Sequence, residues 1–193
     1  MESDRKSRFY LKRKKCTEIS MMQTKNYIDF IWRKETNKFK VIGIFNSEFE
    51  EGKMTAEELW KKSGLTESYE SWSFGGVPDE LAALVKNGEK TATCSAYDLY
   101  LAEGEPIPKE GDYSVILDSK GEAVCIVKTT KVYVIAFNQV SHNHAYKEGE
   151  GDRSLEYWRK VHMDFLTREL AEINKIFTEN TLVVCEEFEL VYT

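Results

Sequence analysis

Long apolar runs are missing from this sequence. No stretch approaches the roughly 20 consecutive apolar residues that a membrane-spanning helix requires. The basic N-terminus is not followed by the apolar core and small-residue cleavage site of a secretory signal. Hydrophobic side chains still make up 41% of the 193 residues and aromatic side chains 12%, which is enough to pack a core. We therefore expect a cytoplasmic protein that has no membrane partner.

Cysteines and histidines spaced like metal ligands are also missing. None of the cysteines forms a C-x-x-C pair, so the sequence predicts neither a zinc site nor a thioredoxin-like motif. The four cysteines are Cys16, Cys94, Cys125 and Cys185. An acidic loop, Glu148–Asp152, could bind a cation, but its alternating glycines are more typical of a flexible turn. We expect free thiols, no bound metal and no cofactor.

Negative charge dominates the larger part of the chain. Residues 54–193 contain 14 Lys/Arg and 25 Asp/Glu, a net charge of −11, whereas residues 1–53 contain 13 and 8, a net charge of +5. Generic binding to a phosphate backbone depends on clustered Lys and Arg. Residues 54–193 are therefore poorly suited to it, and a nucleic-acid ligand would have to be small or find a local basic groove.

Residues 1–53 differ in pattern from the remainder. The run Arg5–Lys15 is basic, and Tyr27–Ile44 mixes aromatic residues with lysines without a sustained helical or strand period. Three interpretations are open: a basic arm, a small packed addition, or a leader that is not native and is poorly ordered. Codons for Glu50–Lys53 can resemble a bacterial ribosome-binding site, so Met54 is a candidate start. We expect residues 54–193 to form the folded domain.

Regular helix and strand patterns begin after Met54. Thr55 is expected to cap a helix that Gly64 ends, and loops are expected at Glu67–Gly76 and Leu99–Lys109. The other expected elements are a helix from Pro78 to Gly88, an extended Lys90–Tyr97, strands at Tyr113–Leu117, Ala123–Phe137 and Thr181–Tyr192, and helices at Asn138–Lys147 and Ser154–Phe177. This order predicts an α+β protein, a small and largely antiparallel barrel with helices over its openings.

The segment Asn87–Thr93 is the strongest candidate for chemistry. Glycine at position 88 allows the backbone to turn sharply and to approach a ligand closely. Lys90 leaves this turn as a cation, and Thr91 and Thr93 supply hydroxyl groups. Taken alone, the G-x-K-T-x-T pattern is short, and a solvated lysine beside two strand threonines is its ordinary interpretation.

The wider pattern resembles the ASCH family, a branch of the PUA-like barrels. In this pattern the lysine turn is followed by a hairpin, by His144-Ala145 shortly before Glu148, and by a terminal strand. The longer bacterial members are similar at Trp72–Gly75, Gly88–Ser95, Glu148–Asp152, Ser154-Leu155 and Tyr157–Arg159. The resemblance implies a mostly antiparallel β-barrel with flanking helices over residues 54–193. It also implies a cleft for RNA or a nucleobase-like ligand near the lysine turn.

One small-domain branch of the family is known as amidohydrolases of N4-acylated cytidines, whose Lys, Thr and Glu correspond here to Lys90, Thr93 and Glu148. In that scheme Thr93 is the nucleophile, Lys90 is its base if burial lowers the lysine pKa, and Glu148 supports proton transfer. His144 could orient Glu148. Residues three apart point to opposite faces of a regular strand, so a bend between Lys90 and Thr93 is required. Ser95 replaces an arginine usual in the small amidohydrolases, which leaves the substrate open.

Further residues near this centre are candidates for ligand binding. They are Trp72, Phe74, Gly88, Thr91, Ser95, Tyr97 and Arg159. The aromatic rings could stack on a base, although packing as core is the simpler interpretation, and Arg159 could contact a ligand anion or the acidic loop. The expected partner is a modified nucleoside or RNA. Hydrolysis of an N-acyl amide is the leading hypothesis, and the alternatives are a non-catalytic RNA-binding module and a ribonuclease.

Overall fold

The structure is a computed structural model that describes residues 14–16, 34–35, 38–39 and 53–193. The chain separates into two compact units, and one of them contains residues 54–193 together with β1 (Lys14–Cys16). In the other unit, β2 (Lys34–Glu35) and β3 (Lys38–Phe39) form an antiparallel pair. Most of the segment for which a basic arm, a packed addition or a leader is expected lies outside the described residues.

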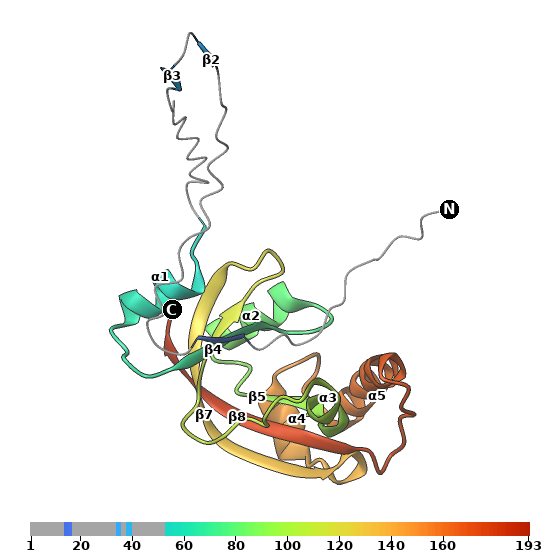
Figure 1. Cartoon of the computed structure of the whole chain (residues 1–193). Helices are drawn as coiled ribbons and strands as arrows, with labels where there is room; N and C mark the ends of the chain where they lie inside the picture. Colours follow the sequence, from blue (N-terminus) through green and yellow to red (C-terminus); the bar gives the residue numbers. More distant parts are fainter. Residues whose placement is uncertain (1–13, 17–33, 36–37, 40–52) are drawn as a thin grey trace. The chain divides into compact units, whose positions relative to one another are not determined.

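Six strands form one mixed sheet in the order β1-β4-β6-β7-β8-β5. The further bounds are β4 (Tyr69–Ser73), β5 (Ala92–Ala96), β6 (Tyr113–Leu117), β7 (Ala123–Ala136) and β8 (Leu182–Tyr192). Among the strands that the structure describes, only β4 and β6 pair in parallel. The long strands β7 and β8 shift register near Thr129, and irregularities of this kind bend a sheet. The sheet curls accordingly (Figure 1), and the expected small, mostly antiparallel barrel of the α+β class is confirmed.

Helices cover both ends of the curled sheet (Figure 1). The helices α1 (Ala56–Ser63) and α2 (Pro78–Lys86) lie toward one end, and α3 (Tyr97–Glu103), α4 (His142–Glu148) and α5 (Leu155–Glu172) lie toward the other. A 3₁₀ turn, Phe137–Gln139, follows β7. In the part of the chain that the structure describes, none of the helices combines the length and apolar composition needed to cross a bilayer.

Local signals place α1 as expected. The Thr55 hydroxyl accepts a hydrogen bond from the Glu58 backbone N–H at 3.2 Å, and the Glu58 carboxylate accepts one from the Thr55 N–H at 2.9 Å. Gly64 ends the helix with φ of 73°. Because these contacts lie within four residues of one another, sequence alone suffices to predict them.

The two segments predicted as loops are partly regular, so both predictions are wrong in part. Within Glu67–Gly76, β4 forms because β6 offers it a parallel partner, and the strand buries Tyr69 and Trp72. Within Leu99–Lys109, α3 continues until Gly104, and it buries its apolar face against the sheet and α5. Both elements are short, and tertiary packing rather than local pattern stabilises them.

One of the core clusters lies where β5 and β8 meet α3, α4 and α5. It contains Cys94 and Cys185, which are direct cross-strand partners and are free thiols, together with Trp158. A second cluster contains Trp72 and Phe74, which are only 1% and 4% exposed. These two rings are therefore core residues in this structure.

Candidate functional site

Lys90 leaves the turn that ends α2 and points inward. Gly88 has φ of 74°, and the Lys90 backbone N–H donates to the Leu84 carbonyl at 3.0 Å. The Lys90 side chain is 1% exposed. Its Nζ lies 2.8 Å from Oε2 of Glu148 and 2.7 Å from Oε1 of Glu150, which stand 58 and 60 positions further along the chain. A buried ammonium thus meets two carboxylates.

The end of α4 is docked against the Lys90 turn. The Thr91 N–H donates to the Lys147 carbonyl at 2.7 Å. Gly149 caps α4 with φ of 75°, and a Cβ at this position would lie 2.5 Å from the carbonyl oxygen of Glu89. Only glycine permits such an approach. Glu148, the last residue of α4, consequently faces Lys90.

Nitrogen atoms from two helices surround the Glu148 carboxylate. Its Oε1 accepts a hydrogen bond from Trp158 Nε1 at 2.8 Å and lies 3.2 Å from His144 Nε2 and 3.5 Å from His162 Nε2. Burial alone would raise the Glu148 pKa, but the Lys90 ammonium and the two imidazoles outweigh it and hold the pKa well below its ordinary value. Glu148 is therefore ionised.

Lys90 is an ammonium ion in this arrangement. Burial alone would lower its pKa, but attraction to Glu148 and Glu150 raises the pKa above its ordinary value. The Phe74 ring, whose centroid is 5.3 Å from Nζ, adds a cation–π contact. A lysine accepts a proton only when it is neutral. With both carboxylates in place, Lys90 is therefore not in the neutral form that the role of base suggested by the sequence needs.

His144 stands beside Glu148 on α4, where the four-residue spacing brings the two side chains to one face. Its Nδ1 lies 3.0 Å from the Tyr133 hydroxyl, while Nε2 faces Glu148 without the alignment of a hydrogen bond. Burial alone would lower the His144 pKa, but Cys185 and Glu148 raise it to about 9. The imidazole thus adds a second positive charge beside Glu148.

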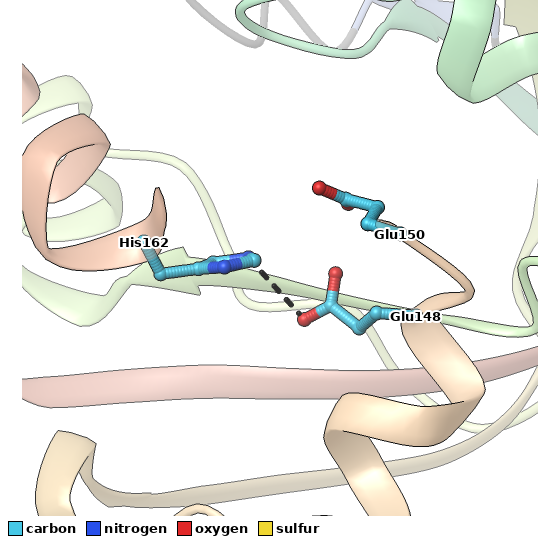
Figure 2. A group of neighbouring side chains, drawn as sticks. All are labelled: Glu148, Glu150 and His162. Carbon is cyan, nitrogen blue, oxygen red and sulfur yellow. Dashed lines mark ion pairs between the residues drawn. The ribbon is translucent and has the colours of Figure 1, made fainter. Parts of the chain in front are cut away.

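Glu148, Glu150 and His162 each bring one potential metal-ligand atom to within 4.8 Å of the others. Figure 2 shows the His162 ring and the Glu148 carboxylate facing each other, with Glu150 on the loop that follows α4. Such oxygen and nitrogen atoms suit divalent cations. The Lys90 ammonium, however, already pairs with both carboxylates and would repel a second cation placed there. We therefore assign no metal to this group.

Thr93 lies on β5, directly opposite Glu186 of β8. Its neighbour Cys94 is packed in the core with Trp158, so alternation along the strand turns Thr93 toward the other face. Thr93 is half-buried, and no hydrogen bond between described residues joins its hydroxyl to Lys90 or Glu148. Of the three residues predicted to act together, the structure brings two into direct contact.

Three of the predicted ligand-binding residues belong to the surroundings of Lys90. Gly88 shapes its turn, Phe74 lies against its Nζ, and the Thr91 hydroxyl is 3.4 Å from the Lys147 carbonyl oxygen. These contacts are internal to the protein. They hold Lys90 and the end of α4 in place.

The other predicted ligand-binding residues have separate partners. The Ser95 hydroxyl shares a buried 2.8 Å hydrogen bond with the Tyr100 hydroxyl, and Tyr97 begins α3. Arg159 donates to the Asn138 carbonyl at 2.9 Å, so among the described residues it bonds to the backbone after β7 and not to the acidic loop. Trp72 is core, as described above. No hydrogen bond between described residues joins any of these four to Lys90 or Glu148.

The sequence does not predict Trp158 and His162 as site residues, and it suggests Glu150 only as part of an acidic loop that could bind a cation. A usable signal exists, because Trp158 and His162 are four residues apart on α5, as His144 and Glu148 are on α4. The Trp158 and His162 rings stack with centroids 4.2 Å apart. These two α5 residues also fit the apolar stripe of the helix, so the pattern alone predicts core.

The family model described as ASCH domain matches residues 70–192. The crystal structure of the ASCH domain from Lactobacillus crispatus JV V101 is 36% identical to this chain with a TM-score of 0.61, and covers 64% of this chain and 79% of that one. The chain is also similar to a protein from Enterococcus faecalis V583 whose crystal structure is known. The two sequences are 37% identical, the TM-score is 0.63, and the match covers 70% of this chain and 85% of that one. No curated protein matches the chain.

Proposed function

Because this chain belongs to the ASCH domain family, we propose that it is a hydrolase that removes the acyl group from an N-acylated nucleoside of the N4-acylcytidine type. The observation that carries the proposal is the Lys90–Glu148 pair, 2.8 Å apart with both side chains 1% exposed. Burying two charges costs several kcal/mol in desolvation. Such a pair places an amine and a carboxylate in fixed contact, which amide cleavage can use for proton transfer and charge stabilisation.

The proposed reaction divides amide cleavage into two steps. The Thr93 hydroxyl oxygen attacks the acyl carbon while its proton passes to a neutral Lys90 amine. The bond between carbon and nitrogen then breaks, and Lys90 returns the proton to the departing amine of the nucleoside. Water hydrolyses the Thr93 ester in the same way, releasing the acid and restoring the hydroxyl. Glu148 holds the Lys90 amine in place throughout.

The reaction makes two demands on the protein. Thr93 has to turn its hydroxyl toward Lys90 when the substrate binds, and Lys90 has to lose the proton that its two carboxylate neighbours now retain. The substrate class suits the charge of the domain, because a nucleoside carries no phosphate and residues 54–193 have a net charge of −11.

Release of cytidine from N4-acetylcytidine, followed by liquid chromatography, tests the proposal. We expect wild-type protein to release cytidine and Lys90→Ala and Glu148→Gln to be slower by roughly 10²-fold or more. Lys61→Ala is the matched control, because Lys61 forms an ion pair of 2.7 Å with Glu57 but is 72% exposed. This variant should keep wild-type activity.

Other outcomes would favour the rival functions. If wild-type protein releases no cytidine but binds single-stranded RNA with an affinity that falls as salt rises, the domain is an RNA-binding module. If it releases no cytidine but cleaves RNA, and Lys90→Ala abolishes the cleavage, the same pair serves a ribonuclease. Either result would refute the amidohydrolase proposal.

A further inference from the structure

Lys90 is covered by protein while both of its carboxylate partners stay in place. The Lys90 side chain is 1% exposed, and its Nζ contacts the carboxylate and the carbonyl of Glu148, at 2.8 and 3.4 Å, and the carboxylate of Glu150 at 2.7 Å. A catalytic amine has to contact its substrate. One of these oxygen atoms must therefore give way to the ligand.

The two carboxylates are held very differently. Glu148 is 1% exposed, ends a helix, and accepts a hydrogen bond from Trp158 as well as from Lys90. Glu150 is 17% exposed, and among the hydrogen bonds of the described residues its carboxylate has only the one to Lys90. Loss of that single bond leaves Glu150 free to enter water, whereas loss of Glu148 would strip a carboxylate of several buried partners. Glu150 is the partner that can leave.

The backbone that carries Glu150 is anchored. The Arg153 side chain forms a 2.6 Å ion pair with Glu89. The Arg153 backbone N–H donates to the Glu150 backbone carbonyl at 2.9 Å. Gly151 lies so close to the Tyr157 ring that a Cβ there would clash with it. Rotation of the Glu150 side chain, without opening of the loop, is therefore the smallest change that uncovers Lys90.

We infer that Glu150 is an internal stand-in for the ligand, whose carboxylate occupies the position at Lys90 that the acyl group of the substrate takes. The identity of that acyl group rests on the proposed function, whereas the position follows from the contacts of Lys90. Hydrolysis of an amide yields a carboxylate, which has the charge and the oxygen atoms of the Glu150 side chain. Return of Glu150 to Lys90 thus expels the product and closes the site.

Substrate binding also changes the charge on Lys90's surroundings. A neutral acyl group that replaces Glu150 leaves Lys90 with one carboxylate in place of two. Attraction to Glu150 is one of the causes that raise the Lys90 pKa, so its departure lowers that pKa. Glu148, which stays in place, continues to raise the Lys90 pKa. Displacement of Glu150 thereby moves Lys90 toward the neutral form that the reaction needs.

Binding of acetate tests the inference without requiring any catalysis. Sodium acetate is titrated into isotope-labelled wild-type protein and Glu150→Gln at constant ionic strength, and the backbone NMR signals of Lys90 and Thr91 are followed. Glu150→Gln keeps the shape of the side chain and removes its charge, so acetate should restore the original charge pattern. We expect acetate to bind the variant at least about tenfold more tightly than wild type.

Glu57→Gln is the matched control. It removes a carboxylate that also lies 2.7 Å from a lysine, but Glu57 is 70% exposed and pairs with Lys61 and not with Lys90. This variant should bind acetate as weakly as wild type does. Glu150→Ala, which also vacates the position, provides a second variant should the glutamine amide itself bond to Lys90, and its thermal unfolding reports whether the fold is retained.

The results separate this inference from the proposed function. Equal acetate binding by wild type and both Glu150 variants would overturn the inference, and so would an equal gain in Glu57→Gln. Tighter acetate binding by the Glu150 variants, together with no cleavage of N4-acetylcytidine by wild type, would support the carboxylate position and refute the amidohydrolase. In an active enzyme, acetate should inhibit Glu150→Gln at least about tenfold more strongly than wild type.

Discussion

The Lys90 Nζ lies 2.8 Å from Oε2 of Glu148 although 58 positions separate the two residues in the chain. Two glycines make this contact possible. Gly88 turns the chain into Lys90 at the end of α2, and Gly149 brings the end of α4 against that turn. Each side chain is 1% exposed, so the pair is a fixed internal feature of the domain and not a surface ion pair.

Removing one member of the pair should destabilise the protein strongly. Lys90→Met leaves Glu148 and Glu150 without their shared cation, and breaking a buried pair in this way costs about 3–5 kcal/mol. The double variant Lys90→Met, Glu148→Gln should recover part of that loss, because the most deeply buried carboxylate is then neutral. Urea denaturation measures the free energy of unfolding of the single and the double variant. Lys61→Met, which breaks an exposed pair of similar length, should leave the midpoint unchanged; an equal loss there would contradict a special role for burial.

Gly149→Ala should disrupt the contact between α4 and the Lys90 turn. Its Cβ would lie 2.5 Å from the Glu89 carbonyl oxygen, in addition to the strain of φ at 75°. Gly64→Ala has the same strain at φ of 73° but nothing within 4 Å, so it should lose only about 1–2 kcal/mol. We expect Gly149→Ala to lose clearly more stability in thermal unfolding and to lose activity as well. Similar losses in the two variants would show that the docking contact is not essential.

The raised His144 pKa of about 9 has a consequence for stability. A raised pKa contributes stability that is present below the ordinary value of about 6.5 and is lost as pH rises through about 9. Cys185 has a pKa lowered to about 6, and its contribution is lost as pH falls through about 6. The two contributions oppose each other over the same pH range, while the pKa shifts of Glu148, Tyr133 and Cys94 keep those groups in one state.

Replacing Cys185 separates these two contributions. In Cys185→Ala only the pH-dependent contribution of His144 to stability remains, because Glu148 still raises the His144 pKa. The free energy of unfolding of this variant should fall as pH rises above about 6.5, whereas that of wild type should change less. Urea denaturation at several pH values measures this, and NMR titration of the imidazole gives the His144 pKa directly. A flat profile in the variant would contradict a protonated His144.

Thr93 variants test whether its hydroxyl is the nucleophile. Thr93→Val keeps the shape of the side chain and should slow cytidine release by roughly 10²-fold or more. Thr93→Ser keeps a hydroxyl group and should retain much of the wild-type rate. Because Thr93 has no hydrogen bond to Lys90 or Glu148 among the described residues, neither variant should change the unfolding midpoint greatly. If Thr93→Val keeps full activity, water and not Thr93 attacks the substrate.

The parts of the fold predicted best are those whose signals are local. The cap at Thr55, the end of α1 at Gly64 and the hairpin of β6 and β7 each depend on residues a few positions apart. β4 was not predicted, because a five-residue strand forms only where a partner such as β6 lies alongside it. Short elements of this kind depend on contacts that the linear pattern does not contain.

The linear pattern was enough to predict the ASCH-type barrel and to select Lys90 and Glu148 as candidates, because glycine-bounded turns and a family pattern are visible in the order of residues along the chain. Which groups surround the Lys90 amine became known only from the folded arrangement. It brought Glu150, Trp158 and His162 to the pair and left Thr93 on a strand without a bond to it. The physical reason is that the charge state of a buried group depends on its burial and on neighbours from distant segments, and both are set by packing.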